Sequence, residues 1–112
     1  MIRPGEVYLA DFEEREPHPV LVVSREELNR GHWVAAVLIT SKRFEERSKQ
    51  PHRVPFRAGE FGLSIDCVAQ TESLFSIRKE DLGEHLGSLD DERWRDLVKA
   101  VGNMMGSDCE PE

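Results

Sequence analysis

Cysteine is scarce in this chain of 112 residues, and the two that occur, Cys67 and Cys109, lie far apart in the sequence. No Cys-x-x-Cys pair exists, so neither a zinc knuckle nor a thioredoxin-like redox motif is indicated. The four histidines also lack the spacing of metal ligands, and we therefore predict no metal site and no cofactor. Such sparing use of cysteine fits a reduced, cytoplasmic setting.

Long apolar runs and glycine-rich phosphate loops are absent as well. No apolar stretch approaches the length needed to cross a membrane, and the first residues hold no apolar core of a signal peptide. The absence of Gly-x-Ser-x-Gly and of phosphate-binding glycine motifs argues against a serine hydrolase and against P-loop or dinucleotide binding. We predict a single domain over residues 1–106, followed by a flexible tail at 107–112.

The chain is acidic overall but basic in one segment. Its formal net charge is −7. Residues 42–57 hold six basic side chains against two acidic ones, a net charge of +4, so the rest of the chain carries −11. A basic loop on an acidic body is a candidate anion-binding segment, and a solvated loop that only maintains solubility is the alternative of equal weight.

The pattern of apolar residues predicts several short strands. Alternating or β-branched segments predict strands at 5–12, 19–23, 32–41, 66–70 and 74–77, with shorter ones at 54–56 and 84–86. Between the second and third of these, Ser24 and Glu27 have the spacing of a capping box that opens one helical turn, which Gly31 closes.

The C-terminal segment is the one clear helix of the sequence. Asp90 is a suitable N-cap, and Gly106 ends the helix. Leu89 and Trp94 are spaced as a hydrophobic staple. The apolar residues that recur at helical spacing are predicted to pack in the core: Trp94, Leu97, Val98, Val101, Met104 and Met105. Short strands and one terminal helix predict an α+β domain, a small, strongly bent β-barrel with the helix against one side.

Four side chains have the chemistry needed to cleave a phosphodiester. Such cleavage needs a group that takes the 2′-hydroxyl proton, a donor to the leaving oxygen, and groups that hold the developing charge. The imidazole of His18 suits proton transfer near neutral pH. The hydroxyls of Thr40 and Ser41 can donate to phosphoryl oxygens, and Glu72 supplies a carboxylate. Each also has an ordinary interpretation, as a surface histidine, a strand-end turn or a solvated acid.

The order of several segments resembles one known family. RPGEVYLADF, HPVLVVSREELNRG and the strand end VAAVLITS follow one another as in the MazF/PemK (Kid) toxins. GLSIDCVAQTESLFSIRKEDL and the helix start GSLDDERWRDLVKAV complete the match, which runs from Arg3 to about Met105. The chain therefore resembles this family of toxin–antitoxin ribonucleases over nearly its whole length.

The resemblance implies a small SH3-like β-barrel of the CcdB/PemK-like type with a C-terminal helix, assembled as a homodimer. It also implies a cytoplasmic, metal-independent endoribonuclease that cuts single-stranded RNA such as mRNA at short sequences. Its products would carry a 2′,3′-cyclic phosphate and a 5′-hydroxyl. The expected partner is a cognate antitoxin whose flexible acidic tail covers the RNA groove, and no membrane is involved.

The resemblance also assigns the proposed catalytic residues. Thr40 and Ser41 occupy the hydroxyl pair of the family's site and are expected to hold phosphoryl oxygens. His18 stands where most members have arginine. This change removes a permanent cation and a bidentate phosphate grip, but it supplies a general acid or base. Glu72 matches the family's acid and is expected to orient His18 or the RNA.

The expected RNA contacts lie in the basic segment and beside Glu72. They are Lys42, Arg43, Arg47 and Arg53, together with Gln70, where some members have arginine, and Ser73, which takes an amide position. Other arginines of the family's pattern are missing, at Phe75 and Asp81. The alternative is therefore a catalytically weakened or inactive barrel that binds an antitoxin or, as CcdB does, a protein target. A barrel adaptor without a toxin role is the third interpretation.

Overall fold

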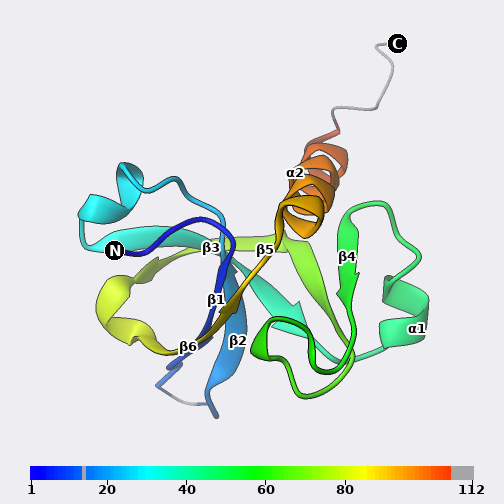
Figure 1. Cartoon of the computed structure of the whole chain (residues 1–112), viewed down its shortest axis with the longest axis horizontal. Helices are drawn as coiled ribbons and strands as arrows, with labels where there is room; N and C mark the ends of the chain where they lie inside the picture. Colours follow the sequence, from blue (N-terminus) through cyan, green and yellow to red (C-terminus); the bar gives the residue numbers. More distant parts are fainter. Residues whose placement is uncertain (14, 107–112) are drawn as a thin grey trace.

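Six strands of the chain pair into one antiparallel sheet (Figure 1). The computed structural model describes residues 1–13 and 15–106, so the predicted tail at 107–112, including Cys109, lies outside the described residues. The spatial order of the strands is β4-β5-β3-β2-β1-β6. Their bounds are β1 Glu6–Ala10, β2 His18–Val22, β3 Trp33–Thr40, β4 Arg53–Phe56, β5 Cys67–Arg78 and β6 Leu82–Ser88.

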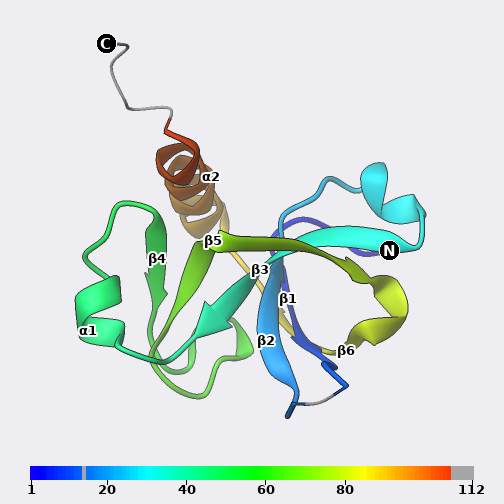
Figure 2. The ribbon, with the colours of Figure 1, turned by 180° about the vertical axis from the view of Figure 1, so that it is seen from behind.

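Helical segments occupy the connections and the C-terminal end. The short ones are η1 (Leu28–Arg30), α1 (Phe44–Arg47), η2 (Glu60–Gly62) and η3 (Lys79–Asp81). The long helix, α2 (Asp91–Met105), lies against β4 and β5 (Figures 1 and 2). Within the described part of the chain, no helix has the length and apolar character needed to cross a membrane. An antiparallel sheet with a C-terminal helix confirms the predicted α+β class.

The sheet is bent so strongly that it buries apolar side chains on both faces. One core joins Leu21, Val37 and Phe56 to Leu97 of α2. The second core lies on the opposite face and includes Val20, Val22, Val34, Ala36 and Ile77. Successive side chains of a strand point to opposite faces, so a strand that serves both cores must be apolar at every position. This explains the uninterrupted apolar run of β2.

The predicted barrel is not closed by backbone pairing. The order of the described strands ends at β4 on one edge and β6 on the other. Instead, η2 packs against β6. The approach is so close that a Cβ atom at Gly62 would lie 2.1 Å from the carbonyl oxygen of Leu86. A Cβ atom at Gly87 would likewise lie 2.6 Å from the backbone of Phe61. Packing of a loop on a strand therefore covers the gap between the two edges.

The two strands predicted at 66–70 and 74–77 are one strand, β5. Its pairing with β3 shifts between Val37, which pairs with Leu74, and Leu38, which pairs with Gln70. Residues 71–73 therefore have no opposite residue in β3 and form a bulge within the strand. The polar kink expected between two strands is this bulge.

The capping box predicted at Ser24 and Glu27 does not form. The hydroxyl of Ser24 instead donates to the Asn29 side chain and accepts a hydrogen bond from the backbone N–H of Ala35 at 3.0 Å. Asn29 is fully buried, and its amide donates to the carbonyl oxygens of Ile2 at 3.0 Å and Ser24 at 2.8 Å. These carbonyl groups are partly buried and need donors, so the buried side chain of Asn29 replaces the expected cap. Gly31 follows η1 as predicted.

The predicted ends of α2 are confirmed. The Asp90 carboxylate accepts a hydrogen bond from the backbone N–H of Arg93 at 2.8 Å, as expected of an N-cap. Gly106 ends the helix with a left-handed φ of 84°.

The prediction that the whole apolar stripe of α2 is core was wrong at two positions. Leu97 and Ala100 are buried, but the side chains of Val98 and Met105 are 54% and 75% exposed. The two exposed residues are seven positions apart and share one face of the helix. α2 contacts the sheet mainly through β4 and β5, and this face of the helix remains exposed among the described residues.

The packing of η2 on β6 makes a prediction about two glycines with similar backbone angles. Gly59 and Gly62 have φ of +93° and +79°, but a Cβ atom at Gly59 would meet nothing within 4 Å. We expect Gly59→Ala to lower the free energy of unfolding by about 1 kcal/mol through left-handed strain. Gly62→Ala should cost roughly 2–4 kcal/mol, because overpacking adds to that strain. Urea unfolding measures both, and equal losses would contradict the close packing.

Candidate active site

Strand pairing aligns several of the predicted site residues on one face of the sheet. Leu38 of β3 pairs with Val20 of β2 on one side and with Gln70 of β5 on the other. Gln70 pairs in turn with Arg53 of β4. Directly paired residues point to the same face, so these four form a row across four strands. His18, two residues before Val20, points to the same face.

His18 lines a cavity of about 700 Å³ at one end of this row. The other residues that line the cavity are Phe12, Arg15, Glu16, Leu38, Lys42, Ser73, Leu74 and Phe75. The rings of Phe12 and Phe75 pack with their centroids 6.0 Å apart. The Nε2 atom of His18 is buried and has no hydrogen-bond partner among the residues that the structure describes. The cavity thus combines apolar walls with two basic groups, one carboxylate and the imidazole of His18.

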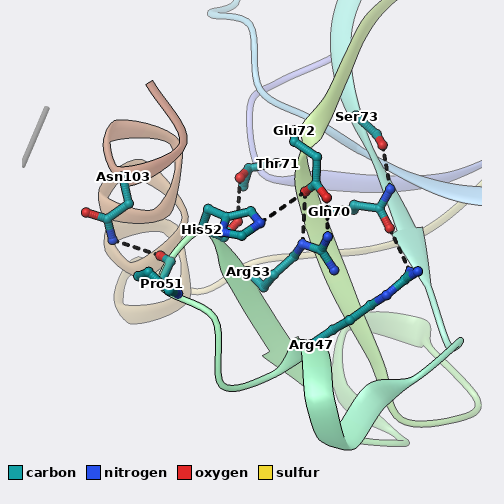
Figure 3. Close-up of polar contacts among 9 residues, drawn as sticks. All are labelled: Arg47, Pro51, His52, Arg53, Gln70, Thr71, Glu72, Ser73 and Asn103. Atoms are coloured by element: carbon teal, nitrogen blue, oxygen red, sulfur yellow. Dashed lines mark hydrogen bonds and ion pairs between the residues drawn. The ribbon is translucent and has the colours of Figure 1, made fainter. Parts of the chain in front are cut away.

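Gln70 connects α1 to this cavity. One guanidinium nitrogen of Arg47 donates to Gln70 Oε1 at 2.9 Å, and Gln70 Nε2 donates to the Ser73 hydroxyl at 2.6 Å (Figure 3). Ser73 itself lines the cavity beside His18. Three of the predicted RNA contacts are therefore joined in one chain of hydrogen bonds, which fixes the position of the Arg47 charge.

Glu72 turns toward β4 rather than toward His18. Arg53 holds its carboxylate with two parallel hydrogen bonds, Nε to Oε1 at 2.9 Å and Nη2 to Oε2 (Figure 3). The Nε2 atom of His52 lies 3.8 Å from the same Oε1. The side chain of Arg53 is only 9% exposed, against 37% for Glu72. Within the described chain, the polar contacts of Glu72 are with these two residues, so it does not orient His18 in this structure.

Thr40 and Ser41 differ in their exposure. Thr40 ends β3 and is buried, and its Oγ1 accepts a hydrogen bond from the backbone N–H of Lys42 at 3.2 Å. Ser41, Lys42 and Arg43 are exposed. Arg43 has a left-handed φ of 53° and leads into α1. Thr40 therefore shapes the turn that presents Ser41 and Lys42, and Lys42 reaches the cavity of His18.

Sequence reasoning missed His52 and Thr71. Thr71 is fully buried in the bulge, and its hydroxyl donates to the backbone carbonyl of His52. Asn103 of α2 donates to the carbonyl of the preceding residue, Pro51, at 2.8 Å (Figure 3). Only the pairing of β4 with β5 brings His52 beside Glu72. The sole sequence signal was the position of His52 immediately before Arg53 in the basic segment.

Two further kinds of chemistry find no support in this region. The described residues include no group of three or more His, Cys, Asp or Glu side chains placed to hold a metal ion. Burial and, to a lesser degree, the charge of Asp66 raise the pKa of the Cys67 thiol to about 11. This thiol is therefore protonated at neutral pH and is not a nucleophile.

The chain is similar to known proteins over almost its full length. Residues 3–105 match the family described as PemK-like, MazF-like toxin of type II toxin–antitoxin system. Endoribonuclease EndoA of Bacillus subtilis is 30% identical over 107 residues, which cover 90% of this chain and 91% of that protein. Endoribonuclease MazF of Staphylococcus saprophyticus is 26% identical over 112 residues, which cover 95% and 92%.

A solved structure shares the fold. It is an endoribonuclease in complex with its cognate antitoxin from Mycobacterial species, with a TM-score of 0.79 and 23% sequence identity. The match covers 95% of this chain and 96% of that chain. The described strands and α2 therefore have the arrangement found in that enzyme.

The pairing of Arg53 with Glu72 predicts strong energetic coupling. Removing the partner of a nearly buried charged donor leaves that charge without a hydrogen bond, which lowers the free energy of unfolding. A double-mutant cycle of Arg53→Met and Glu72→Gln should therefore give a coupling energy of about 1–3 kcal/mol. The exposed pair of Arg57 and Asp66, with a distance of 3.1 Å, is the control and should couple by about 0–1 kcal/mol. Urea unfolding measures both cycles. Equal couplings would show that burial does not strengthen the first pair.

Proposed function

The chain belongs to the PemK-like, MazF-like toxin family of type II toxin–antitoxin systems, and from this membership we propose that it is an endoribonuclease that cleaves single-stranded RNA. One structural observation carries the proposal. The row that contains Gln70 and Arg53 leads to a cavity of about 700 Å³ in which His18 has a buried nitrogen without a partner. We propose that the enzyme acts in the cytoplasm and without a metal ion.

In the proposed reaction, the 2′-oxygen of a nucleotide attacks the adjacent phosphorus as the bond to the 5′-oxygen breaks. The products are a 2′,3′-cyclic phosphate and a 5′-hydroxyl. From its place in the cavity, His18 either takes the proton of the 2′-oxygen or gives a proton to the 5′-oxygen. Ser41 and Lys42, presented by the turn that Thr40 shapes, hold the phosphoryl oxygens. Water serves as the acceptor or donor of the proton at the other oxygen.

The RNA path follows the local positive charge of an otherwise acidic protein. Lys42 and Arg15 line the cavity, and Arg47 is held beside it through Gln70 and Ser73. Arg53 is paired with Glu72, so in this proposal the two residues lie at the far end of the path and take no part in the cleavage step. The basic segment thus supplies cations to the region where family arginines are missing, which favours an active enzyme over an inactive barrel.

The proposed partners follow from the family. We propose a homodimer and a cognate antitoxin, because a similar structure is an endoribonuclease in complex with its cognate antitoxin. An acidic antitoxin segment would compete with RNA phosphates for Lys42 and Arg47.

The proposal predicts cleavage of long single-stranded RNA by the purified protein, unchanged by excess EDTA. Mass spectrometry of the fragments should find 2′,3′-cyclic phosphate ends. Intact RNA after incubation with well-folded protein would refute the proposed activity, and cleavage abolished by EDTA would refute its independence of metal.

A proton-transfer role for His18 predicts a large loss of rate on substitution. His18→Gln should lower the cleavage rate by about 10²-fold, because glutamine cannot exchange a proton at neutral pH. The exposed His32, at the opposite end of β3, provides the matched control, and His32→Gln should cleave at the wild-type rate. Equal rates for wild type and His18→Gln in single-turnover assays would exclude this role.

The proposed homodimer predicts a solution mass of twice the chain mass of 12.8 kDa. Sedimentation equilibrium over a range of concentrations measures it. A mass of 12.8 kDa at every concentration would rule out a stable dimer.

A further inference from the structure

His52 lies at the far end of the row from His18 and has no part in the reaction described above. We propose that His52, together with Arg53 and Glu72, forms a separate subsite for a phosphate group of single-stranded RNA, which is positively charged only when His52 is protonated. The inference deepens the proposed ribonuclease function and rests on it for the identity of the ligand.

The backbone around His52 is held firmly from two sides. The buried hydroxyl of Thr71 donates to the His52 carbonyl, and the Asn103 amide of α2 donates to the carbonyl of Pro51 at 2.8 Å (Figure 3). The backbone N–H of Arg53 also donates to the carbonyl of Gln50 at 3.1 Å. These contacts fix the backbone of His52 beside the bulge of β5, and the side chain of His52 remains 29% exposed. His52 is thus positioned and still open to a ligand.

Hydrogen bonding within the cluster leaves donors available. Nε2 of His52 lies 3.8 Å from Glu72 Oε1, beyond hydrogen-bond distance, and within the described part of the chain the imidazole makes no hydrogen bond. The Nη1 atom of Arg53 is buried and has no acceptor among the described residues, although the other two nitrogens of this guanidinium bind Glu72. A buried donor without an acceptor is uncommon and is satisfied when an anionic oxygen approaches.

The charge of the cluster depends on His52. Arg53 and Glu72 cancel one another, so the cluster is neutral when the imidazole is neutral and carries one positive charge when it is protonated. From α2, Asp96 and Lys99 line the adjoining groove of about 300 Å³ with Arg53, and their charges also cancel. Protonation of His52 therefore adds one positive charge to surroundings whose other charges cancel.

The ligand class follows from the position of the cluster on the sheet. Arg53 pairs with Gln70, which binds Ser73 in the cavity of His18. Three strand spacings of about 4.8 Å separate β2 from β4, which is too far for both histidines to reach one phosphate. A flexible polyanion bound in the cavity would continue across Gln70 to this subsite. Single-stranded RNA offers phosphates at regular intervals along such a path.

Salt dependence of binding provides a direct test. The probe is a labelled, randomised 2′-O-methyl RNA, which cannot be cleaved because its 2′-oxygens are blocked. Fluorescence anisotropy gives Kd between about 50 and 200 mM salt, the range over which phosphate contacts are resolved. Measurements at about pH 5.5 and about pH 8.5 lie on either side of the ordinary histidine pKa.

Each phosphate contact on a single strand contributes about −0.7 to the slope of log K against log salt. In the wild type, the slope should be steeper at the lower pH than at the higher pH. In His52→Gln, this difference in slope between the two pH values should be smaller by about 0.7. His32→Gln is the control and should behave as wild type. Thermal unfolding confirms that both variants remain folded.

An identical pH-dependent change in slope for wild type and His52→Gln would overturn the subsite. The subsite would also be overturned if binding of an oligoglutamate peptide depended on His52 and binding of RNA did not. That result would assign the cluster to an acidic protein partner. Failure of the proposed function is distinguishable. A protein that binds the probe through His52 but cuts no unmodified RNA would retain the subsite and lose the ribonuclease assignment.

Discussion

The antiparallel pairing of β3 with β5 is the interaction on which the other parts of the structure depend. It extends from Trp33 and Arg78 at one end to Thr40 and Val68 at the other. β2 pairs with the outer side of β3, and β4 pairs with the outer side of β5. Each strand therefore takes its register from this central pair. A shift of one residue in the register of this pair would move every apolar side chain of the shifted strand to the opposite face of the sheet.

The bulge at residues 71–73 is a local interruption of this pairing with two consequences. It lets β5 bend, and the bent sheet covers Val37 of β3 in one core and Ala36 in the other. The bulge also turns Glu72 toward β4 and Ser73 toward the cavity of His18, whereas Thr71 is buried. Glu72 meets Arg53, whereas Ser73 meets Gln70. One irregularity in the central pairing thus shapes both the core and the candidate active site.

Basic side chains gather beside β5 although the chain as a whole is acidic. The four-residue helix α1 and β4 place Arg47 and Arg53 against β5, where each binds a side chain of that strand. Such paired cations are fixed in place, whereas Lys42 remains exposed at the cavity. Only the tertiary structure shows that these two arginines, which precede β5 in the sequence, bind side chains of that strand.

The sequence by itself determined the features that depend on neighbouring residues. The apolar runs placed the strands, Asp90 and Gly106 marked the ends of α2, and the clustered cations marked the basic segment. The family resemblance added the expectation of a small barrel and of site roles for His18 and Glu72. Helix caps and strand propensities act over a few residues, so a single chain displays them directly.

Only the tertiary structure decided which distant residues meet. It placed His52 and Arg53, and not His18, beside Glu72. It also left Val98 and Met105 exposed on a helix whose periodicity predicted burial, and it replaced a capping box by the buried side chain of Asn29. These outcomes depend on strand register and on which surface of α2 reaches the sheet. Both are set by the packing of the whole chain, because each contact joins segments whose local sequences carry no information about one another.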